Sequence, residues 1–258
     1  MTGPSTTTAV IEMEEVRVAS FGDASLTVAS GINWRVAAGD YWVVAGLQGC
    51  GKSDFLMMTG GLMAPASGVY RLFGERMPIF DEERLPTRLR LGLVFDGGGR
   101  LFNQLTVREN VALPLRYHQN LAKSEVEGQV HELLEAVGLS AWADRTPGAL
   151  GQNWQKRVGL ARALILAPEV LLVDNPLAGL DLRYASWWLN FLRQLSSGHP
   201  LLHGRPMTLV VSTAELRPWK DQACQFAVLK DQQLAVVGAR EQLAQLSGEL
   251  LQELLPDQ

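Results

Sequence analysis

The sequence contains little cysteine and little net charge. Cys50 and Cys224 are its two cysteines, too few for a disulfide framework, and neither has the spacing of a metal ligand. This scarcity favours a reducing compartment. The net charge of −4 provides no general attraction to nucleic acid or to anionic lipid. We therefore expect no nucleic-acid partner.

Long hydrophobic runs are also missing. A helix that spans a bilayer needs about 18 to 20 mostly apolar residues. The richest run, residues 158–173, is interrupted by Arg162, Pro168 and Glu169. The first ten residues, MTGPSTTTAV, lack the basic region and the apolar core of a secretory signal. We expect a soluble protein that can lie beneath a membrane, with residues 1–9 as a disordered lead.

Short apolar runs of strand length alternate with helical patterns, which favours an α/β fold with a mainly parallel sheet. An early antiparallel pair is expected at residues 10–18 and 34–36, and helical spacing dominates between residues 100 and 168. The later expected strands are residues 41–45, 91–95, 170–173 and 208–212, and the clearest helices are residues 125–137 and 155–167. Leucines at positions 243, 246, 250, 251, 254 and 255 predict an amphipathic helical tail.

The strongest motif is GLQGCGKS, residues 46–53, which matches G-x-x-x-x-G-K-[ST] directly after an expected strand. Glycines let the backbone N–H groups of such a loop wrap around phosphates, and the next helix directs its positive end at them. Lys52 is expected to reach the β- and γ-phosphates, and the Ser53 hydroxyl to bind Mg²⁺. The expected phosphate-loop contacts are Gly46, Gln48, Gly49, Cys50, Gly51, Lys52 and Ser53.

The segment VLLVDNP, residues 170–176, has the form of a Walker B motif, an apolar strand that ends in an acid. Asp174 would lie at the carboxyl end of this strand, where open α/β sheets bind their ligands. Alone, such an aspartate is more often a turn or cap residue. Together with the phosphate loop, it is expected to hold Mg²⁺ through water.

The ordered set of motifs resembles the ABC transporter ATPase family over residues 10–238. The segment LGLVFDGGGRLFNQLTVRENVALPL looks like its Q-loop and the start of its helical subdomain. ALGQNWQKRVGLARALILAPEVLLVDNPLAGLD resembles its signature, Walker B and D-loop, TLVVSTAEL its switch strand, and VLKDQQLAVVG its closing hairpin. Phe21 lies where the family places an aromatic residue that stacks on adenine. Within the family, ENVALPLRYHQNL and EAVGL are similar to the Mla-like subunits of MCE-type lipid transporters.

This resemblance implies a P-loop NTPase fold of the ABC type, with an antiparallel β subdomain and an inserted helical subdomain. The implied nucleotide-binding core covers residues 10–99 and 169–238, the helical signature subdomain residues 100–168, and the helical tail residues 239–258. ATP and Mg²⁺ are the implied cofactors. The implied partners are a transmembrane permease, a second nucleotide-binding subunit (a homodimer) and an MCE-type lipid-binding protein. The implied location is the cytoplasmic face of the inner membrane, as a peripheral subunit.

Several positions depart from the family pattern where hydrolysis takes place. Asn175 replaces the glutamate that polarises the attacking water, and an amide cannot accept a proton. Loss of such a base typically lowers the rate roughly 100- to 10,000-fold. Ala214 replaces the switch histidine that contacts the γ-phosphate. Asp96 replaces the Q-loop glutamine; it remains a candidate Mg²⁺ ligand, although it is shorter and adds a negative charge.

The signature and the phosphate loop depart as well. The signature, usually L-S-G-G-Q, reads LGQNW, residues 150–154. Gly151 and Gln152 remain candidate nucleotide contacts, whereas Trp154 either packs locally or obstructs a closed dimer. Asp54 stands where the family has threonine. A carboxylate about 4 Å from a phosphate costs about 4 kcal/mol at an effective dielectric constant near 20, unless Asp54 turns away or caps the helix.

In this family each nucleotide lies between the Walker motifs of one chain and the signature of its partner, so these losses weaken both halves of the site. We expect a transporter subunit that binds Mg-ATP with little or no hydrolysis and contacts its permease near residues 96–100. One alternative is an active transport ATPase in which Asp96 acts as a surrogate base. The other is a structural or regulatory subunit that binds no nucleotide, in which the tail, Trp187 and Trp188 matter more. No long coiled-coil insertion is present, which argues against a DNA-repair-type member.

Overall fold

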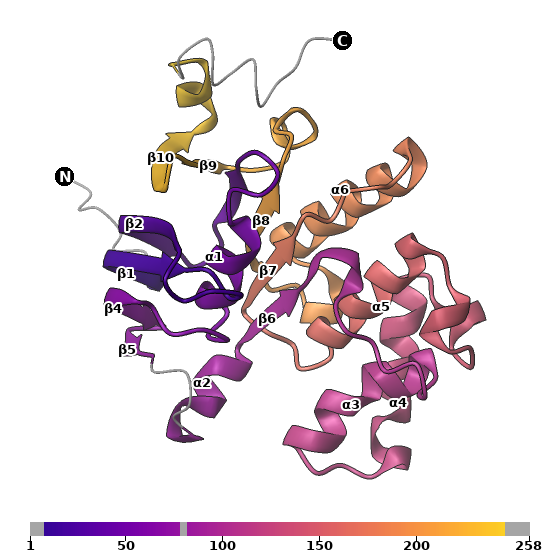
Figure 1. Ribbon diagram of the computed structural model, residues 1–258. Helices are drawn as coiled ribbons and strands as arrows, with labels where there is room; N and C mark the ends of the chain where they lie inside the picture. Colours follow the sequence, from indigo (N-terminus) through magenta and orange to yellow (C-terminus); the bar gives the residue numbers. More distant parts are fainter. Residues whose placement is uncertain (1–7, 78–81, 246–258) are drawn as a thin grey trace, which may run out of the picture.

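The computed structural model describes residues 8–77 and 82–245, and the strands and helices of the fold are those within these ranges. Six strands form one sheet in the order β10-β9-β3-β8-β7-β6, and four form a second sheet in the order β2-β1-β4-β5. In Figure 1 the smaller sheet and the helices α3 to α5 lie on opposite sides of the larger sheet. The fold therefore has a central sheet, a β-rich part on one side and a helical block on the other.

The larger sheet is mainly parallel, as predicted. β3 pairs in parallel with β8 and β9, and β7 with β6 and β8, whereas β9 and β10 are antiparallel. Its strands are β3 (Tyr41–Ala45), β6 (Leu91–Val94), β7 (Val170–Asp174), β8 (Thr208–Thr213), β9 (Gln225–Lys230) and β10 (Gln233–Ala239). Every residue of β3, β7 and β8 is buried, as expected for parallel strands that are covered on both faces.

The smaller sheet is antiparallel throughout. Its strands are β1 (Ala9–Ala19), β2 (Thr27–Ala37), β4 (Ser67–Leu72) and β5 (Glu75–Arg76). β1 and β2 are the early antiparallel pair that the sequence predicted, although β2 begins seven residues before the expected range. The helix α1 (Lys52–Thr59) contacts strands of both sheets, and its Phe55 is fully buried. This helix follows the phosphate loop, so packing on two sides fixes the position of that loop.

Side chains that alternate along the larger sheet divide the core into two clusters. Val43 and Val173 belong to the cluster that includes the helical block, whereas Val44 and Leu172 belong to the cluster that includes α1 and the smaller sheet. This two-sided pattern follows from the period of two along a strand. The remaining helices are α2 (Leu85–Leu89), α3 (Val107–His118), α4 (Lys123–Ala136), α5 (Gln152–Leu164) and α6 (Leu182–Ser197).

Helix α5 begins and ends earlier than the predicted range of residues 155–167. Its first turn includes Gln152, so the helix starts within the signature segment. It ends before Ala167, whose φ is 50°, because the residue before a proline, here Pro168, avoids the helical region. Of the predicted tail, a short 3₁₀ helix, Arg240–Gln245, is described, and the leucines from position 246 onward lie outside the described residues. In this part of the chain, no helix is both long and apolar enough to cross a bilayer.

The position of β7 inside the sheet gives a stability prediction. Leu172 is fully buried in β7, so Leu172→Ala is expected to lower the free energy of unfolding by about 2–5 kcal/mol through lost contacts and a cavity. Leu182, at the start of α6, is 87% exposed, and Leu182→Ala is expected to change it by less than about 0.5 kcal/mol. Urea denaturation of both variants measures the difference. Equal stabilities would contradict this placement of β7.

Candidate functional site

The phosphate loop connects the buried strand β3 to helix α1. Gly49 and Gly51 have φ values of 82° and 92°, a region that glycine adopts at little cost. A Cβ at Gly51 would also collide with the side chain of Val28 on β2. Leu47, Gln48 and Gly49 are exposed at the top of the loop. The loop thus presents its backbone to solvent, at the carboxyl end of a parallel strand and the N-terminus of a helix.

Lys52 lies folded over this loop. Its side chain is largely buried, and its Nζ donates to the backbone oxygens of Gly46 at 2.6 Å and Leu47 at 2.8 Å. The Sγ atom of Cys50 is 3.8 Å from the same nitrogen. The ammonium group is therefore held at the loop by backbone acceptors, at the place where a phosphate group would compete for it.

The carboxylate of Asp174, at the carboxyl end of β7, joins the loop to the sheet. Its side chain is 5% exposed. Its Oδ2 accepts from the hydroxyl of Ser53 at 2.6 Å, and its Oδ1 from the hydroxyl of Ser212 on β8 at 2.5 Å. The hydroxyl of Ser212 also accepts from the backbone N–H of Asn175 at 3.0 Å.

This arrangement fits a magnesium ion that is bound together with phosphate. Ser53 and Asp174 supply hard oxygen atoms close to each other, as Mg²⁺ prefers. The described part of the chain has no group of three or more His, Cys, Asp or Glu side chains that could hold a metal alone. Mg²⁺ usually takes one or two carboxylates and completes its shell with water and substrate phosphates. Ser53 and Asp174 therefore fit a Mg²⁺ ion that is bound together with a nucleotide.

The two positions where the family has catalytic side chains lie at the ends of neighbouring strands. Asn175 follows β7 and Ala214 follows β8, and β7 and β8 pair so that Asp174 is opposite Ser212. Asn175 has a φ of 46°, which asparagine tolerates better than most residues. Neither its amide nor the methyl group of Ala214 can accept a proton. A water molecule at this edge would find no general base in these two side chains.

Asp96 lies in a 3₁₀ helix, η2 (Asp96–Gly98), after β6, and it has a cationic partner. One of its carboxylate oxygens is 3.2 Å from Nζ of Lys156 on α5. Sequence reasoning missed Lys156, because the two residues are far apart in the chain and no motif connects them. Asp96, predicted as a Mg²⁺ ligand, is thus paired with an ammonium group in the structure.

Asp54 is turned toward Phe21. Its Oδ1 accepts from the backbone N–H of Phe21 at 3.0 Å, so the carboxylate contacts the segment between β1 and β2. The ring of Phe21 is 67% exposed, which leaves its face free for a stacked base. This contact supports the alternative in which Asp54 turns away from the phosphates, without testing whether ATP is bound.

The signature segment forms the first turn of α5. Gly151 is the N-cap, Gln152 is exposed, and the amide side chain of Asn153 is buried. Trp154 packs locally, with its ring centroid 5.8 Å from that of Trp142 and 6.0 Å from that of Tyr184. A pocket of about 340 Å³ opens here, lined by Gly151, Gln152, Asn153, Trp154, Gly179, Leu180, Asp181 and Tyr184.

Arg157 continues this aromatic cluster toward α6. Its guanidinium carbon is 3.4 Å from the ring centroid of Trp187 and 4.8 Å from that of Trp154. Burial lowers the pKa of Arg157 to about 10, so the group stays charged near neutral pH and keeps its cation–π contacts. Trp188 is fully buried in the core. The tryptophan pair at positions 187 and 188 is therefore used in packing.

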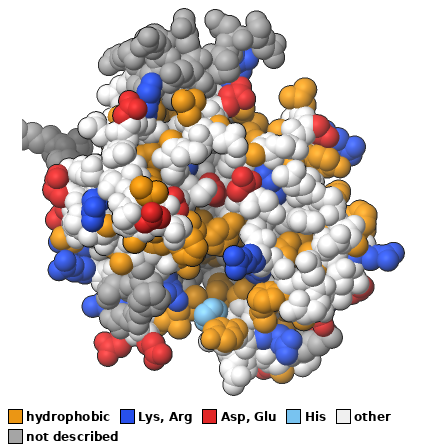
Figure 2. Space-filling model, viewed as in Figure 1, with side chains coloured by type: hydrophobic (Ala, Val, Ile, Leu, Met, Phe, Trp, Pro, Cys, Tyr) orange, Lys and Arg blue, Asp and Glu red, His pale blue; other side chains and the backbone are white. Residues whose placement is uncertain are grey.

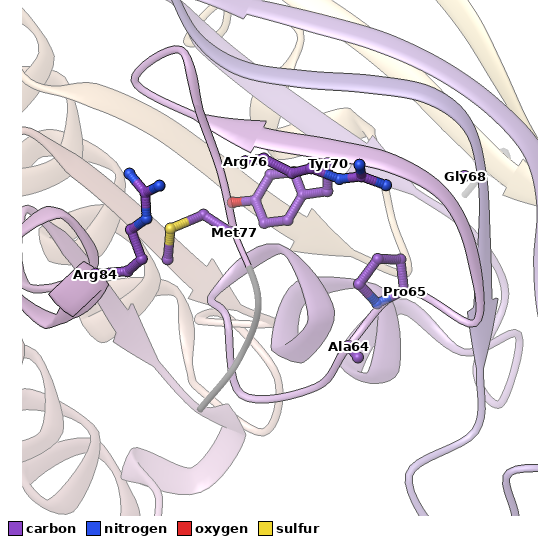
Figure 3. A pocket seen from close by; sticks show the side chains of 7 residues that line it. All are labelled: Ala64, Pro65, Gly68, Tyr70, Arg76, Met77 and Arg84. Carbon is purple, nitrogen blue, oxygen red and sulfur yellow. The ribbon is translucent and has the colours of Figure 1, made fainter. Parts of the chain in front are cut away.

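A larger cavity, of about 460 Å³, lies in the β-rich part (Figure 3). Its lining consists of Ala64, Pro65, Gly68, Tyr70, Arg76, Met77 and Arg84. The hydroxyl of Tyr70 donates to the backbone oxygen of Thr59 at 2.5 Å, and burial raises its pKa above the ordinary value. None of the predicted site residues lines this cavity, so we assign the chemistry to the loop at the end of β3.

Comparison with known proteins gives consistent matches over most of the chain. A family model described as ABC transporter matches residues 29–178, more than half of the sequence. The chain is 35% identical to the methionine import ATP-binding protein MetN 2 of Paraburkholderia xenovorans, over 80% of this chain and 52% of that protein. It is 34% identical to the sulfate/thiosulfate import ATP-binding protein CysA of Methylococcus capsulatus, over 87% of this chain and 62% of that protein. The chain thus spans about half to three fifths of these relatives.

Solved structures agree in fold. CbiO1 of Clostridium perfringens, part of the ABC transporter complex cbiONQ, superposes with a TM-score of 0.77 at 22% identity over 96% of both chains. A dimeric ATP-binding cassette in a post-hydrolysis state, bound to ADP and Pi, superposes with a TM-score of 0.75 at 26% identity, over 87% of this chain and 96% of that one. With the motif order and the family match, these likenesses show that the chain belongs to the ABC transporter family and carries its ATP-binding domain.

Proposed function

We propose that this chain is the nucleotide-binding subunit of an ABC-type membrane transporter, and that it holds Mg-ATP with little or no hydrolysis. One observation carries the proposal. Lys52, Ser53 and Asp174 are retained and all form hydrogen bonds at the phosphate loop. Asn175 and Ala214, at the same edge of the sheet, offer no proton acceptor. The residues that would bind a nucleotide are thus retained, whereas two residues that would hydrolyse it are replaced.

Two features support nucleotide binding. ATP and Mg²⁺ are the cofactors of the family's ATP-binding domains, and the backbone of the phosphate loop, Lys52, Ser53 and Asp174 would hold them here. Asp54, the position that most threatens binding, directs its carboxylate at the N–H of Phe21. That contact gives the carboxylate a hydrogen-bond donor and links α1 to the segment that carries the ring of Phe21.

Slow hydrolysis follows from the side chains at the carboxyl ends of β7 and β8, beside the proposed nucleotide site. A bound Mg²⁺ ion would stabilise negative charge on the phosphates, but the attacking water also has to lose a proton. Asn175 can orient a water molecule and cannot take its proton. The alternative base, Asp96, already contacts the ammonium group of Lys156 at 3.2 Å. The active-ATPase alternative would require Asp96 to leave this pair.

The partners in this proposal follow from the family. A second nucleotide-binding subunit, most simply another copy of this chain, would complete each site with its LGQNW segment. The permease would contact the groove between core and helical block near residues 96–100. Figure 2 shows one face of the molecule, on which apolar side chains gather in a central hollow. We place the chain at the cytoplasmic face of the inner membrane, with residues 10–99 and 169–238 as its core and 100–168 as its helical subdomain.

The transported substrate is a separate proposal. The curated relatives are named as import proteins for methionine, for spermidine/putrescine and for sulfate/thiosulfate. Lipid transport, with an MCE-type protein as a further partner, is supported by the Mla-like segments ENVALPLRYHQNL and EAVGL.

Restoring the missing side chains is expected to increase ATP turnover. Asn175→Glu/Ala214→His returns a proton acceptor and a polar group for the γ-phosphate, so turnover should rise by on the order of 10- to 100-fold. The gain stays below that of a complete site because the signature segment is unchanged. Phosphate release by the purified chains, with Asn175→Gln as a control that adds no base, measures this effect. Rapid wild-type turnover that Lys52→Ala abolishes would contradict the proposal.

Mg-ATP is expected to stabilise the folded chain. A ligand at about 100 times its Kd that binds only the folded state adds about 2.7 kcal/mol, so the thermal midpoint should rise. Lys52→Ala removes the ammonium group from the loop and should show no rise at the same concentration. A wild-type midpoint that does not change with nucleotide would favour the alternative of a structural or regulatory subunit.

Substitutions at Asp54 separate its two possible effects. Asp54→Asn keeps an oxygen that can accept from the N–H of Phe21, and we expect it to change the ATP affinity less than about fivefold. Asp54→Ala removes the acceptor and should weaken binding about three- to tenfold. Titration calorimetry with Mg-ATP measures both. If Asp54→Asn tightened binding by more than about 100-fold, the carboxylate would instead be repelling the phosphates.

A further inference from the structure

A buried ammonium group lies where three functional segments meet. Lys156, on the signature helix α5, is 1% exposed. Its Nζ donates to the backbone oxygens of Asn175 at 3.1 Å, Pro176 at 3.3 Å and Ala178 at 2.9 Å. The carboxylate of Asp96 lies 3.2 Å away. Lysine is almost never fully buried without partners, and these four oxygens provide them.

The three backbone oxygens belong to the turn that follows the Walker B strand β7. This turn is part of the core and begins at Asn175, the position of the lost catalytic base. Helix α5 contacts α3 in the helical block and also β6 of the core. Lys156 therefore adds a polar connection from α5 to the turn after β7, through hydrogen-bond donors that no neutral aliphatic side chain could supply.

The segment 96–100 is fastened to the same helix. Gly98 packs on the backbone of α5 so closely that a Cβ would collide with the oxygen of Gln155, and a Cβ at Gly159 would collide with Gly98. Further along, Nη1 of Arg162 donates to the backbone oxygen of Arg100 at 2.9 Å. The Q-loop segment and α5 thus form one packed unit, and Asp96 adds a charge to its contact with Lys156.

We propose that Lys156 is a positioning residue that fixes this unit to the turn after β7, with Asp96 as its counter-ion. A displacement of that turn is then transmitted to α5 and to the segment 96–100. The role of Lys156 in the free chain is independent of nucleotide. A consequence of this positioning is that Mg-ATP bound at the phosphate loop changes the helical block, and this consequence rests on the proposed function.

The test is amide hydrogen exchange of the full chain, read by peptide, with Lys156→Met as the main variant. Methionine keeps much of the side-chain volume and removes all the donors. Without nucleotide, we expect exchange in both segments 96–100 and 175–180 to become faster by about tenfold or more, because two segments lose one shared partner. Asp144→Asn, which breaks the exposed pair of Arg108 and Asp144, is the matched control and should leave both segments unchanged.

A second arm adds Mg-ATP. In the wild type, exchange should slow both at the loop 46–54 and in α3; in Lys156→Met it should slow at the loop alone. A role confined to stability would not remove the distant response while keeping the local one. If the wild-type loop does not respond to Mg-ATP, the proposed function fails, and the first arm still decides the role of Lys156.

Should Lys156→Met not fold, Asp96→Asn serves in its place, because this side chain is 48% exposed. It removes the charge of the counter-ion, and we expect exchange at 175–180, on the other side of the ammonium group, to become about threefold faster. Wild-type exchange rates in 175–180 for the folded variant would overturn the proposal.

Discussion

The interaction on which the rest of the site depends is the pairing of the buried carboxylate of Asp174 with two hydroxyl groups. A charged group that is buried without partners is strongly unfavourable, so Ser53 and Ser212 have to stay beside it. Ser53 belongs to α1 and Ser212 to β8, which means that one acid aligns the phosphate-loop helix, β7 and β8. The positions of Lys52, Asn175 and Ala214 follow from this alignment.

The same alignment separates binding from cleavage. The donors and oxygens that would surround a Mg-nucleotide are supplied by backbone and by residues that the family motif retains. The groups that would move a proton are supplied by single side chains after β7 and β8, and these are an amide and a methyl group. Asp96, the surrogate base of the active-ATPase alternative, is paired with Lys156. A subunit of this kind would act through the occupancy of its site more than through repeated hydrolysis.

Sequence reasoning predicted what depends on local patterns. The mainly parallel sheet and the early antiparallel pair followed from apolar runs, and the contact of Ser53 with Asp174 links two recognisable motifs. It could not predict contacts between residues that no motif connects. The contacts of Asp54 with Phe21 and of Asp96 with Lys156 join distant parts of the chain. An aspartate can pair with many donors, so its identity does not predict which residue it contacts. Helix α5 starts at Gln152, before the predicted range, because apolar spacing marks the packed face of a helix and does not mark an exposed first residue such as Gln152.

The most direct measurement is the identity of the nucleotide that stays on the protein. The wild-type chain would be incubated with ATP and Mg²⁺, separated from free nucleotide, denatured and analysed by chromatography, with Lys52→Ala treated in parallel. Our account predicts that close to one equivalent of intact ATP is recovered from the wild type and none from Lys52→Ala. Recovery of ADP in its place, or of no nucleotide, would contradict it.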